Sequence, residues 1–201
     1  MIEELKHKLE SIDSVLNEES MKSSNELDIK RGFNPSQSYT DKELAKFYPS
    51  GIELFKKKGD ESKYLLLEVK IEKGADTYAK QYLRGFDMPL PSHPVLAEQF
   101  LREELEPVLA PNFKLPDRWP QIGKPINDEW EKTVISEYDG IKLSISAVGG
   151  GKFDLKNNSI NLREKSRSFG PVPLKYQDRF NELINQLVQR PAYNGFKVNF
   201  E

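Results

Sequence analysis

The first apolar pattern along the chain predicts an amphipathic helix over residues 2–17. Apolar side chains recur there at spacings of three and four residues, at Ile2, Leu5, Leu9, Ile12 and Leu16. Charged side chains fill most of the other positions, so the apolar residues form one narrow stripe. Such a stripe either packs against the chain's own sheet or pairs with a second copy as a coiled coil, which would make a homo-oligomer. Packing on its own chain is favoured, because barely two heptads are present.

The next part of the chain predicts a loop followed by short elements. Residues 18–40 are polar, and "TDKELAKFYPSG" begins with a capping pattern that predicts a short helix over 40–49. The alternating runs "GIELFKKK" and "KYLLLEVKIEK" predict two strands, because "GDES" between them is rich in turn-forming residues. The run from Asp76 to about Phe86 then predicts another helix.

Prolines are dense in the middle of the chain, where one clear helical pattern appears. "HPVLAEQFLREELEPVL" predicts a helix over 93–109, with Pro94 at a position that helices accept. His93 before it is interpreted as a cap or a surface residue. Residues 110–125 have no regular period, and we interpret them as an extended connector anchored by Phe113 and Trp119, or as a boundary between two lobes.

The last third of the chain has the clearest alternation. Asp139-Gly140 predicts the loop of a hairpin, because both positions of a two-residue loop can need positive φ. The resulting register places Glu137 opposite Lys142. A second hairpin is predicted around Asn157-Asn158, with the glycines before it allowing a bend between the hairpins. A helix over 171–190 and a terminal strand over 195–200 complete the chain.

Together these patterns predict an α+β fold: an antiparallel sheet of hairpins with helices packed on one face and an amphipathic N-terminal helix. Three segments are expected. Residues 1–87 form a helical and hairpin lobe, residues 88–128 a proline-rich helical connector, and residues 129–201 the C-terminal hairpins and helix. The three could also form one continuous domain.

The amino-acid composition limits the kinds of catalytic and metal-binding site that the chain can form. The 201 residues include no cysteine, which excludes a thiolate nucleophile and a cysteine-ligated zinc site. Only His7 and His93 are present, so a metal site within one chain would rely on oxygen ligands, as magnesium and manganese sites do. The net charge of -2 lacks the basic excess of most nucleic-acid-binding proteins. The charged N-terminus and the absence of a long apolar run predict a soluble, cytoplasmic protein without a membrane partner.

One group of charged residues on the predicted strands could form a metal site. The expected register puts Glu53 one diagonal step from Glu68, so that both carboxylates could hold one magnesium or manganese ion. Lys70 would lie beside an attacking water, as phosphodiester hydrolysis requires. The alternative interpretation is an ordinary half-buried strand, since Leu67, Val69 and Ile71 alternate with the charged residues Glu68, Lys70 and Glu72.

This arrangement resembles the Asp…Glu-x-Lys motif of the PD-(D/E)xK nuclease superfamily, over residues 49–82. Some members carry Gln and Tyr on the helix after the motif, and Gln81 and Tyr82 lie in the helix predicted here. The resemblance implies a metal-dependent nuclease whose metal ligands are Glu53 and Glu68 and whose further catalytic residues are Lys70 and Gln81. The sequence departs from the motif because "PSG" stands where the first aspartate is expected.

A second group of residues forms a basic loop before the last helix. Arg163, Lys165 and Arg167 alternate in "NLREKSRSFGPVP", so we expect them to share a strand face, with Ser168 near the helix start. Arginines and a hydroxyl there could bind a phosphate-bearing ligand, a nucleotide or an acidic surface. The alternative is a charged strand edge that discourages pairing with other molecules.

Three functions therefore remain, ranked as follows. The first is a non-catalytic binding protein (an adaptor, an inhibitor or an immunity-type protein) that acts on another protein through its surface and needs no cofactor. The second is the nuclease, which would act on nucleic acid with magnesium or manganese. The third is a phosphate- or nucleotide-ligand binder that uses the basic loop. The sequence leaves open whether the chain is an enzyme.

Overall fold

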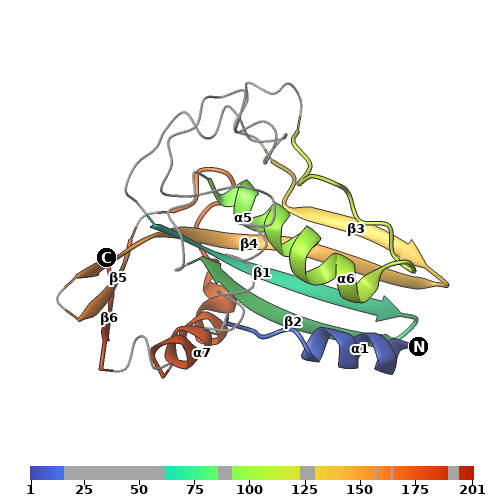
Figure 1. The fold of residues 1–201 in the computed structure, drawn as a ribbon, viewed down its shortest axis with the longest axis horizontal. Helices are drawn as coiled ribbons and strands as arrows, with labels where there is room; N and C mark the ends of the chain where they lie inside the picture. The colour runs from blue at the N-terminus through green and yellow to red at the C-terminus, as the bar shows by residue number, and fades with distance from the viewer. Residues whose placement is uncertain (16–61, 86–91, 123–129, 157, 164, 190–194) are drawn as a thin grey trace.

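A computed structural model describes residues 1–15, 62–85, 92–122, 130–156, 158–163, 165–189 and 195–201 of the chain. These residues form one curled, six-stranded sheet with helices packed against it (Figure 1). The predicted α+β class is confirmed. Residues 16–61, which carry the loop, the short helix and the first strand expected before position 62, lie outside the described residues.

The sheet joins strands from distant parts of the chain. Its strands are β1 (Ser62–Lys73), β2 (Asp76–Gly85), β3 (Thr133–Tyr138), β4 (Ile141–Lys156), β5 (Ser159–Arg163) and β6 (Lys197–Phe200). Their order is β2-β1-β4-β5-β6, and β3 pairs with the first part of β4. β1 therefore lies beside β4, although the two come from the first and third predicted segments; the division into segments stays a prediction.

The sheet is not wholly antiparallel, which corrects one part of the prediction. β5 and β6 run parallel, whereas the other neighbouring pairs run antiparallel. The reason is the connection between them: a helical crossover returns the chain to the end of the sheet where β5 began, and such a connection favours a parallel neighbour.

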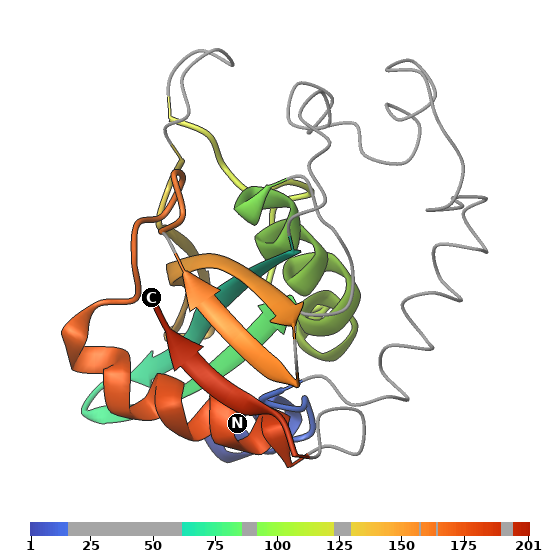
Figure 2. The same ribbon diagram turned by 90° about the vertical axis from the view of Figure 1, so that its left-hand side faces the viewer.

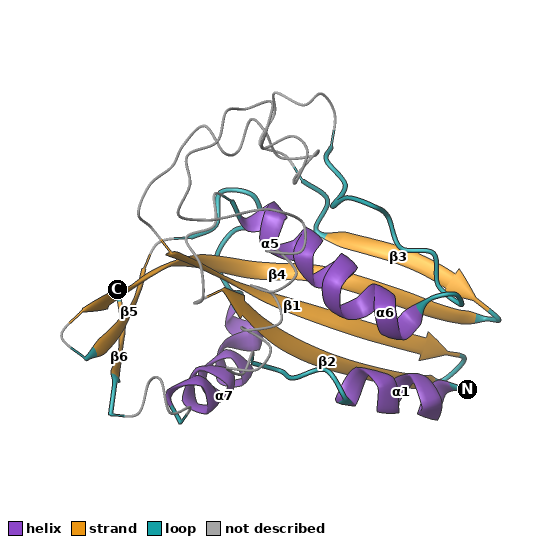
Figure 3. Cartoon of the chain, in the orientation of Figure 1, coloured by secondary structure: helices purple, strands orange, loops and turns teal. Residues whose placement is uncertain are grey.

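The helices lie on both faces of the sheet, which corrects a second part (Figure 2). α1 (Ile2–Glu10) and a continuous helical run of α5 (His93–Gln99), η1 (Phe100–Leu105) and α6 (Glu106–Leu109) pack on one face. η2 (Leu174–Tyr176) and α7 (Gln177–Val188) pack on the other (Figure 3). The alternation of side chains along β1 explains this arrangement. Leu65 and Leu67 belong to the apolar cluster on one face, and Tyr64 and Leu66 belong to the cluster on the other.

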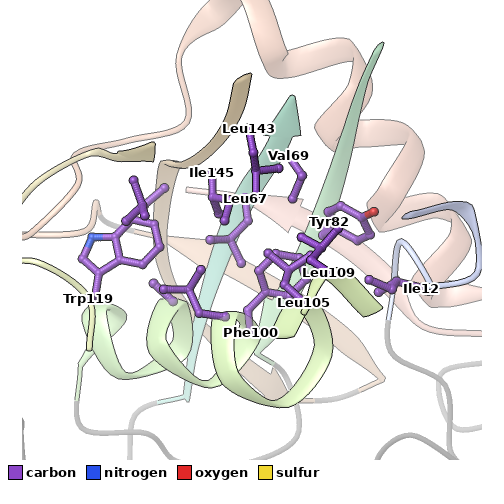
Figure 4. Packing of buried hydrophobic residues seen from close by; sticks show 14 of the residues in the cluster. Ile12, Leu67, Val69, Tyr82, Phe100, Leu105, Leu109, Trp119, Leu143 and Ile145 are labelled. Atoms are coloured by element: carbon purple, nitrogen blue, oxygen red, sulfur yellow. The ribbon is translucent and has the colours of Figure 1, made fainter. Parts of the chain in front are cut away.

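The larger apolar cluster fills the space between the sheet and the helical run α5–η1–α6. Leu67, Val69 and Ile145 point from the strands toward Phe100 and Leu105 of η1 (Figure 4). All of these side chains are buried. The helix predicted over 93–109 is therefore present and buries its apolar face, although its middle part is a π-helix.

The predicted helix over 76–86 is wrong, because these residues form strand β2. Gly74 adopts a φ of +61° in the tight turn that joins β1 to β2, and Lys73 pairs with Asp76 across it. Every residue of β2 then pairs with β1, up to Gly85 opposite Tyr64. Pairing with a long neighbouring strand outweighs a weak local helical pattern.

The N-terminal segment packs on its own chain, as the favoured alternative expected. The helix is shorter than the predicted span 2–17, because α1 ends at Glu10 and residues 11–15 are not helical. Leu5 and Leu9 of α1 are buried in the larger cluster together with Ile12. The chain then crosses the outer edge of β2, where Val15 forms a parallel bridge with Leu83. The apolar stripe of α1 is therefore covered by its own chain.

The last third of the chain shows the pairs that its alternation predicts. Glu137 lies opposite Lys142 in the β3–β4 hairpin, whose loop residues Asp139 and Gly140 have φ of +50° and +69°. The three glycines expected to bend between hairpins lie inside β4 instead. Two of them lie close to other parts of the backbone: a Cβ on Gly149 would lie 2.3 Å from the carbonyl oxygen of Pro171, and one on Gly150 would lie 2.3 Å from that of Tyr64.

Candidate functional site

Among the described residues, α7 covers one end of one face of the sheet, and no described helix packs over the other end. We call the open part the polar face. It consists of the outward side chains of four neighbouring strands, namely Thr77, Ala79 and Gln81 of β2, Glu68, Lys70 and Glu72 of β1, Lys142, Ser144 and Ser146 of β4, and Thr133, Ile135 and Glu137 of β3. These side chains are half-buried or exposed. They lie in register in three rows across the strands, because opposite positions of paired strands point to the same side.

The row nearest α7 contains a hydrogen-bonded cluster around Glu68. Gln81 lies opposite Glu68 on β2, and its side-chain amide donates to Glu68 Oε2 at 2.7 Å. The Tyr176 hydroxyl, which η2 brings over the sheet, donates to Glu68 Oε1 at 3.0 Å. Both carboxylate oxygens therefore have a neutral donor, one from the neighbouring strand of the same hairpin and one from η2, which lies 108 positions away in the sequence.

Burial and the neighbouring carboxylate fix the protonation of Tyr176. Partial burial of the phenol, followed by the charge and hydrogen bond of Glu68, raises the pKa of Tyr176 to about 12. Its hydroxyl therefore keeps its proton at neutral pH and acts as a hydrogen-bond donor. This helps to orient the Glu68 side chain on the polar face.

Lys70 is engaged with a different carboxylate. Its ammonium group lies 2.6 Å from Glu72 Oε1, and a hydrogen bond from Lys70 lowers the pKa of the Glu72 carboxyl. Lys70 and Glu68 share the polar face, as the strand alternation predicts. Lys70 and Glu72 therefore form an ion pair on the polar face, and Glu68 beside them accepts hydrogen bonds from neutral groups.

The residues of the predicted nuclease site are only partly brought together. Glu68, Lys70 and Gln81 lie on one face, whereas Glu53 lies outside the described residues. Gln81 and Tyr82 are on a strand and not on a helix, which corrects the expected context of the resemblance. Tyr82 points to the opposite face, where its buried hydroxyl donates to the Leu9 carbonyl at 2.9 Å. The described residues contain no group of three acidic or histidine side chains that could hold a metal ion. The catalytic and metal-binding roles stay predictions.

The residues of the basic loop do not share a strand face, because β5 ends at Arg163. Lys165 and Arg167 are exposed in the turns that follow, and Ser168 is half-buried. The loop is held firmly to β4. The Ser166 amide donates to the Gly150 carbonyl at 2.7 Å, and the Gly150 amide donates to the Gly170 carbonyl at 3.0 Å. Anion binding by this loop stays a prediction.

Two residues make contacts that the sequence did not predict. Tyr176 falls within the helix predicted over 171–190, and nothing in its sequence neighbourhood signals a hydrogen bond to Glu68. His93 is buried and not on the surface, and its Nε2 donates to the Gly151 carbonyl at 2.9 Å. Both contacts depend on strands that are far away in the sequence.

Among the described residues, no helix is both long enough and apolar enough to cross a membrane. Comparison with known proteins gives no match to this chain, whether to protein-family models, to curated proteins or to solved structures.

Proposed function

We propose that the chain is a non-catalytic binding protein, of the adaptor, inhibitor or immunity type, that recognises another protein through the polar face of its sheet. The observation that carries the proposal is the cluster of Glu68, Gln81 and Tyr176. Its side chains hold one another at 2.7 and 3.0 Å on a surface that solvent can reach. Hydrogen-bonding groups fixed before binding lose little side-chain entropy when a partner docks.

The composition of the polar face fits a protein partner. It combines carboxylates, ammonium groups, hydroxyls and an amide with one large apolar side chain, Ile135, which is 57% exposed. Protein interfaces use such apolar anchors within a polar surround, and the polar groups give specificity. The face carries both signs of charge, which favours a partner with a matching alternation of charges over a uniformly charged polymer.

A site-specific cross-linking experiment tests the proposal. A photo-reactive amino acid is placed at Ser144, in the middle of the polar face, and at Lys8 on the exposed side of α1 as a control. We expect one protein to cross-link from position 144 and not from position 8. That protein is then purified and its affinity measured by calorimetry. Gln81→Ala and Lys70→Ala should weaken binding about tenfold or more, as losses near 1.4 kcal/mol produce. Unchanged affinity in both variants would refute the proposal.

A nuclease assay decides between this proposal and the second function. The purified chain is incubated with single- and double-stranded DNA and RNA in the presence of magnesium or manganese. Cleavage that disappears in Glu68→Ala and in Lys70→Ala would replace the binding function with catalysis. Cleavage that persists in both variants would point to a contaminating enzyme and would leave the proposal standing.

A further inference from the structure

β3 is an edge strand, because β4 is its one partner among the described strands and its other side faces outward (Figure 1). One contact fixes which backbone groups point outward. The Ala147 amide donates to the Lys132 carbonyl at 2.8 Å, so position 132 bonds inward to β4. Inward and outward positions alternate along an antiparallel pair. Residues Thr133, Ile135 and Glu137 therefore direct their amides and carbonyls away from β4.

The contacts of Glu131 agree with this alternation and show where the open edge begins. The Glu131 amide donates to the Pro120 carbonyl at 3.0 Å, and the Trp119 indole donates to the Glu131 carbonyl at 2.6 Å. The preceding segment thus closes the edge at position 131. Within the described part of the chain, no backbone hydrogen bond reaches the outward groups of residues 133, 135 and 137, and all three side chains are exposed.

We propose that this open edge pairs with the same edge of a second copy of the chain, so that two β3 strands join antiparallel about a two-fold axis. Ile135 is the middle one of the three outward positions. Pairing centred on it places Ile135 opposite the partner's Ile135, and two exposed apolar side chains cover each other. A two-fold interface requires such a self-complementary surface.

The neighbouring positions suit the same register. Thr133 faces the partner's Glu137, so that a hydroxyl donor lies opposite a carboxylate acceptor, and the pairs formed by positions 133, 135 and 137 bring no two like charges together. The outward positions carry neither the lysine nor the proline that commonly keeps an edge from pairing. The partner strand ends at Tyr138, where the turn at 139–140 leads it to its own β4. The partner strand therefore turns away before it reaches Glu131 of the first copy, where contacts with Pro120 and Trp119 already occupy the edge.

This inference is independent of the proposed function, because a single copy could still bind another protein through the polar face. If the chain dimerises, the two polar faces continue across the two-fold axis. A failure of dimerisation would leave the cross-linking result at Ser144 untouched, and the two ideas can be told apart.

Measuring mass in solution tests the dimer. Sedimentation equilibrium over a concentration series should show a monomer that becomes a dimer as concentration rises. Ile135→Pro removes an outward amide and leaves the inward bonds to β4 intact, so the variant should fold and stay monomeric. Leu174→Lys changes a side chain that is 91% exposed in η2 and should dimerise like the original chain. A monomer at every concentration, or an Ile135→Pro variant that still dimerises, would overturn the proposal.

Disulfide trapping tests the register, and it does not depend on the proline variant. The chain has no cysteine, so each engineered thiol is unique. Facing Cα atoms of a hydrogen-bonded pair lie about 5.5 Å apart, which a disulfide can span. Mild oxidation should link Ile135→Cys to itself. Thr133→Cys and Glu137→Cys should link when mixed and not alone. Self-linking of Thr133→Cys as fast as that of Ile135→Cys would overturn the proposed pairing.

Discussion

The ammonium group of Lys80 lies 2.8 Å from the backbone carbonyl of Ile12, just beyond the end of α1. The same group is 3.3 Å from the carbonyls of Leu9 and of Glu10, and the Tyr82 hydroxyl also donates to the Leu9 carbonyl. The last carbonyls of a helix have no partner within the helix. Side chains of β2 therefore supply the donors that end α1, although they lie far away in the sequence.

Removing the Lys80 ammonium group should destabilise the contact between β2 and the end of α1. Lys80→Met keeps the aliphatic chain and leaves the three carbonyls without this donor. We expect the free energy of unfolding to fall by about 1–3 kcal/mol, because buried polar groups lose a hydrogen bond. Urea denaturation followed by circular dichroism measures the change. The control is Lys8→Met, which breaks an exposed pair with Glu4 at 3.0 Å and should cost no more than about 1 kcal/mol. Equal losses in both variants would contradict the capping role.

A second prediction concerns the ion pair between Arg84 and Glu104. Arg84 is buried, and its Nε and Nη2 lie 2.7 and 2.5 Å from the two oxygens of Glu104 on η1. It also donates to the carbonyls of Asp13 and Ser14 at 2.7 and 3.1 Å. Arg84→Met should lower the free energy of unfolding by about 3–5 kcal/mol, because Glu104 is left without its cation.

The double variant Arg84→Met with Glu104→Met separates the pair from its surroundings. It removes both charges, so it should be more stable than Arg84→Met alone, since no unpaired carboxylate remains. Chemical denaturation of the four proteins gives the coupling free energy between the two side chains. A double variant that loses as much as the sum of the two single variants would show that the residues act independently.

The sequence predicted those elements whose apolar pattern is strong and local. The helix over 93–109 has an apolar face of many residues, and the Asp139-Gly140 loop sets its own register through positive φ. The predicted helix at β2 failed because Tyr78, Lys80, Tyr82 and Arg84 alternate along one side of a strand, and two of the four are charged. Their burial depends on α1 and η1, which lie elsewhere in the sequence, and a local pattern does not report it.

The polar face could be predicted in part. The alternation of Glu68, Lys70 and Glu72 with apolar residues placed the three side chains together, as observed. Two features escaped prediction. Tyr176 reaches Glu68 across 108 positions of the chain, and β3 joins the face only because β4 pairs with both β1 and β3. Such contacts follow from the topology of the sheet, which no single stretch of sequence specifies.

The glycine at position 150 gives a third prediction. A Cβ there would lie 2.3 Å from the Tyr64 carbonyl oxygen and 3.1 Å from His93 Cδ2. Gly150→Ala should therefore force the strands apart and lower the free energy of unfolding by about 1–3 kcal/mol or more. Ser144→Ala, at an open position of the same strand, is the matched control and should change stability by less than about 0.5 kcal/mol. Thermal unfolding of the two variants compares them, and a Gly150→Ala variant as stable as the control would refute the close approach.

The last prediction is a pH dependence that originates at His93. Burial lowers the pKa of His93 from its ordinary value of 6.5 to about 4, against the opposing hydrogen bond to the Gly151 carbonyl, and the charges of Lys63 and Lys152 lower it further. The unfolded chain therefore binds a proton at this residue between pH 6.5 and pH 4, and the folded chain does not. Stability from this residue is present above pH 6.5 and is lost as the pH falls toward 4.

A variant isolates this effect from the carboxylates that titrate in the same range. His93→Gln keeps an amide donor that can reach the Gly151 carbonyl and cannot take up a proton. Relative to this variant, the original chain should lose up to about 3 kcal/mol of unfolding free energy between pH 6.5 and pH 4. Urea denaturation at a series of pH values gives the difference directly. Parallel curves for the two proteins would mean that folding does not change the pKa of His93, and the buried imidazole would then have to be accessible to protons in the folded chain.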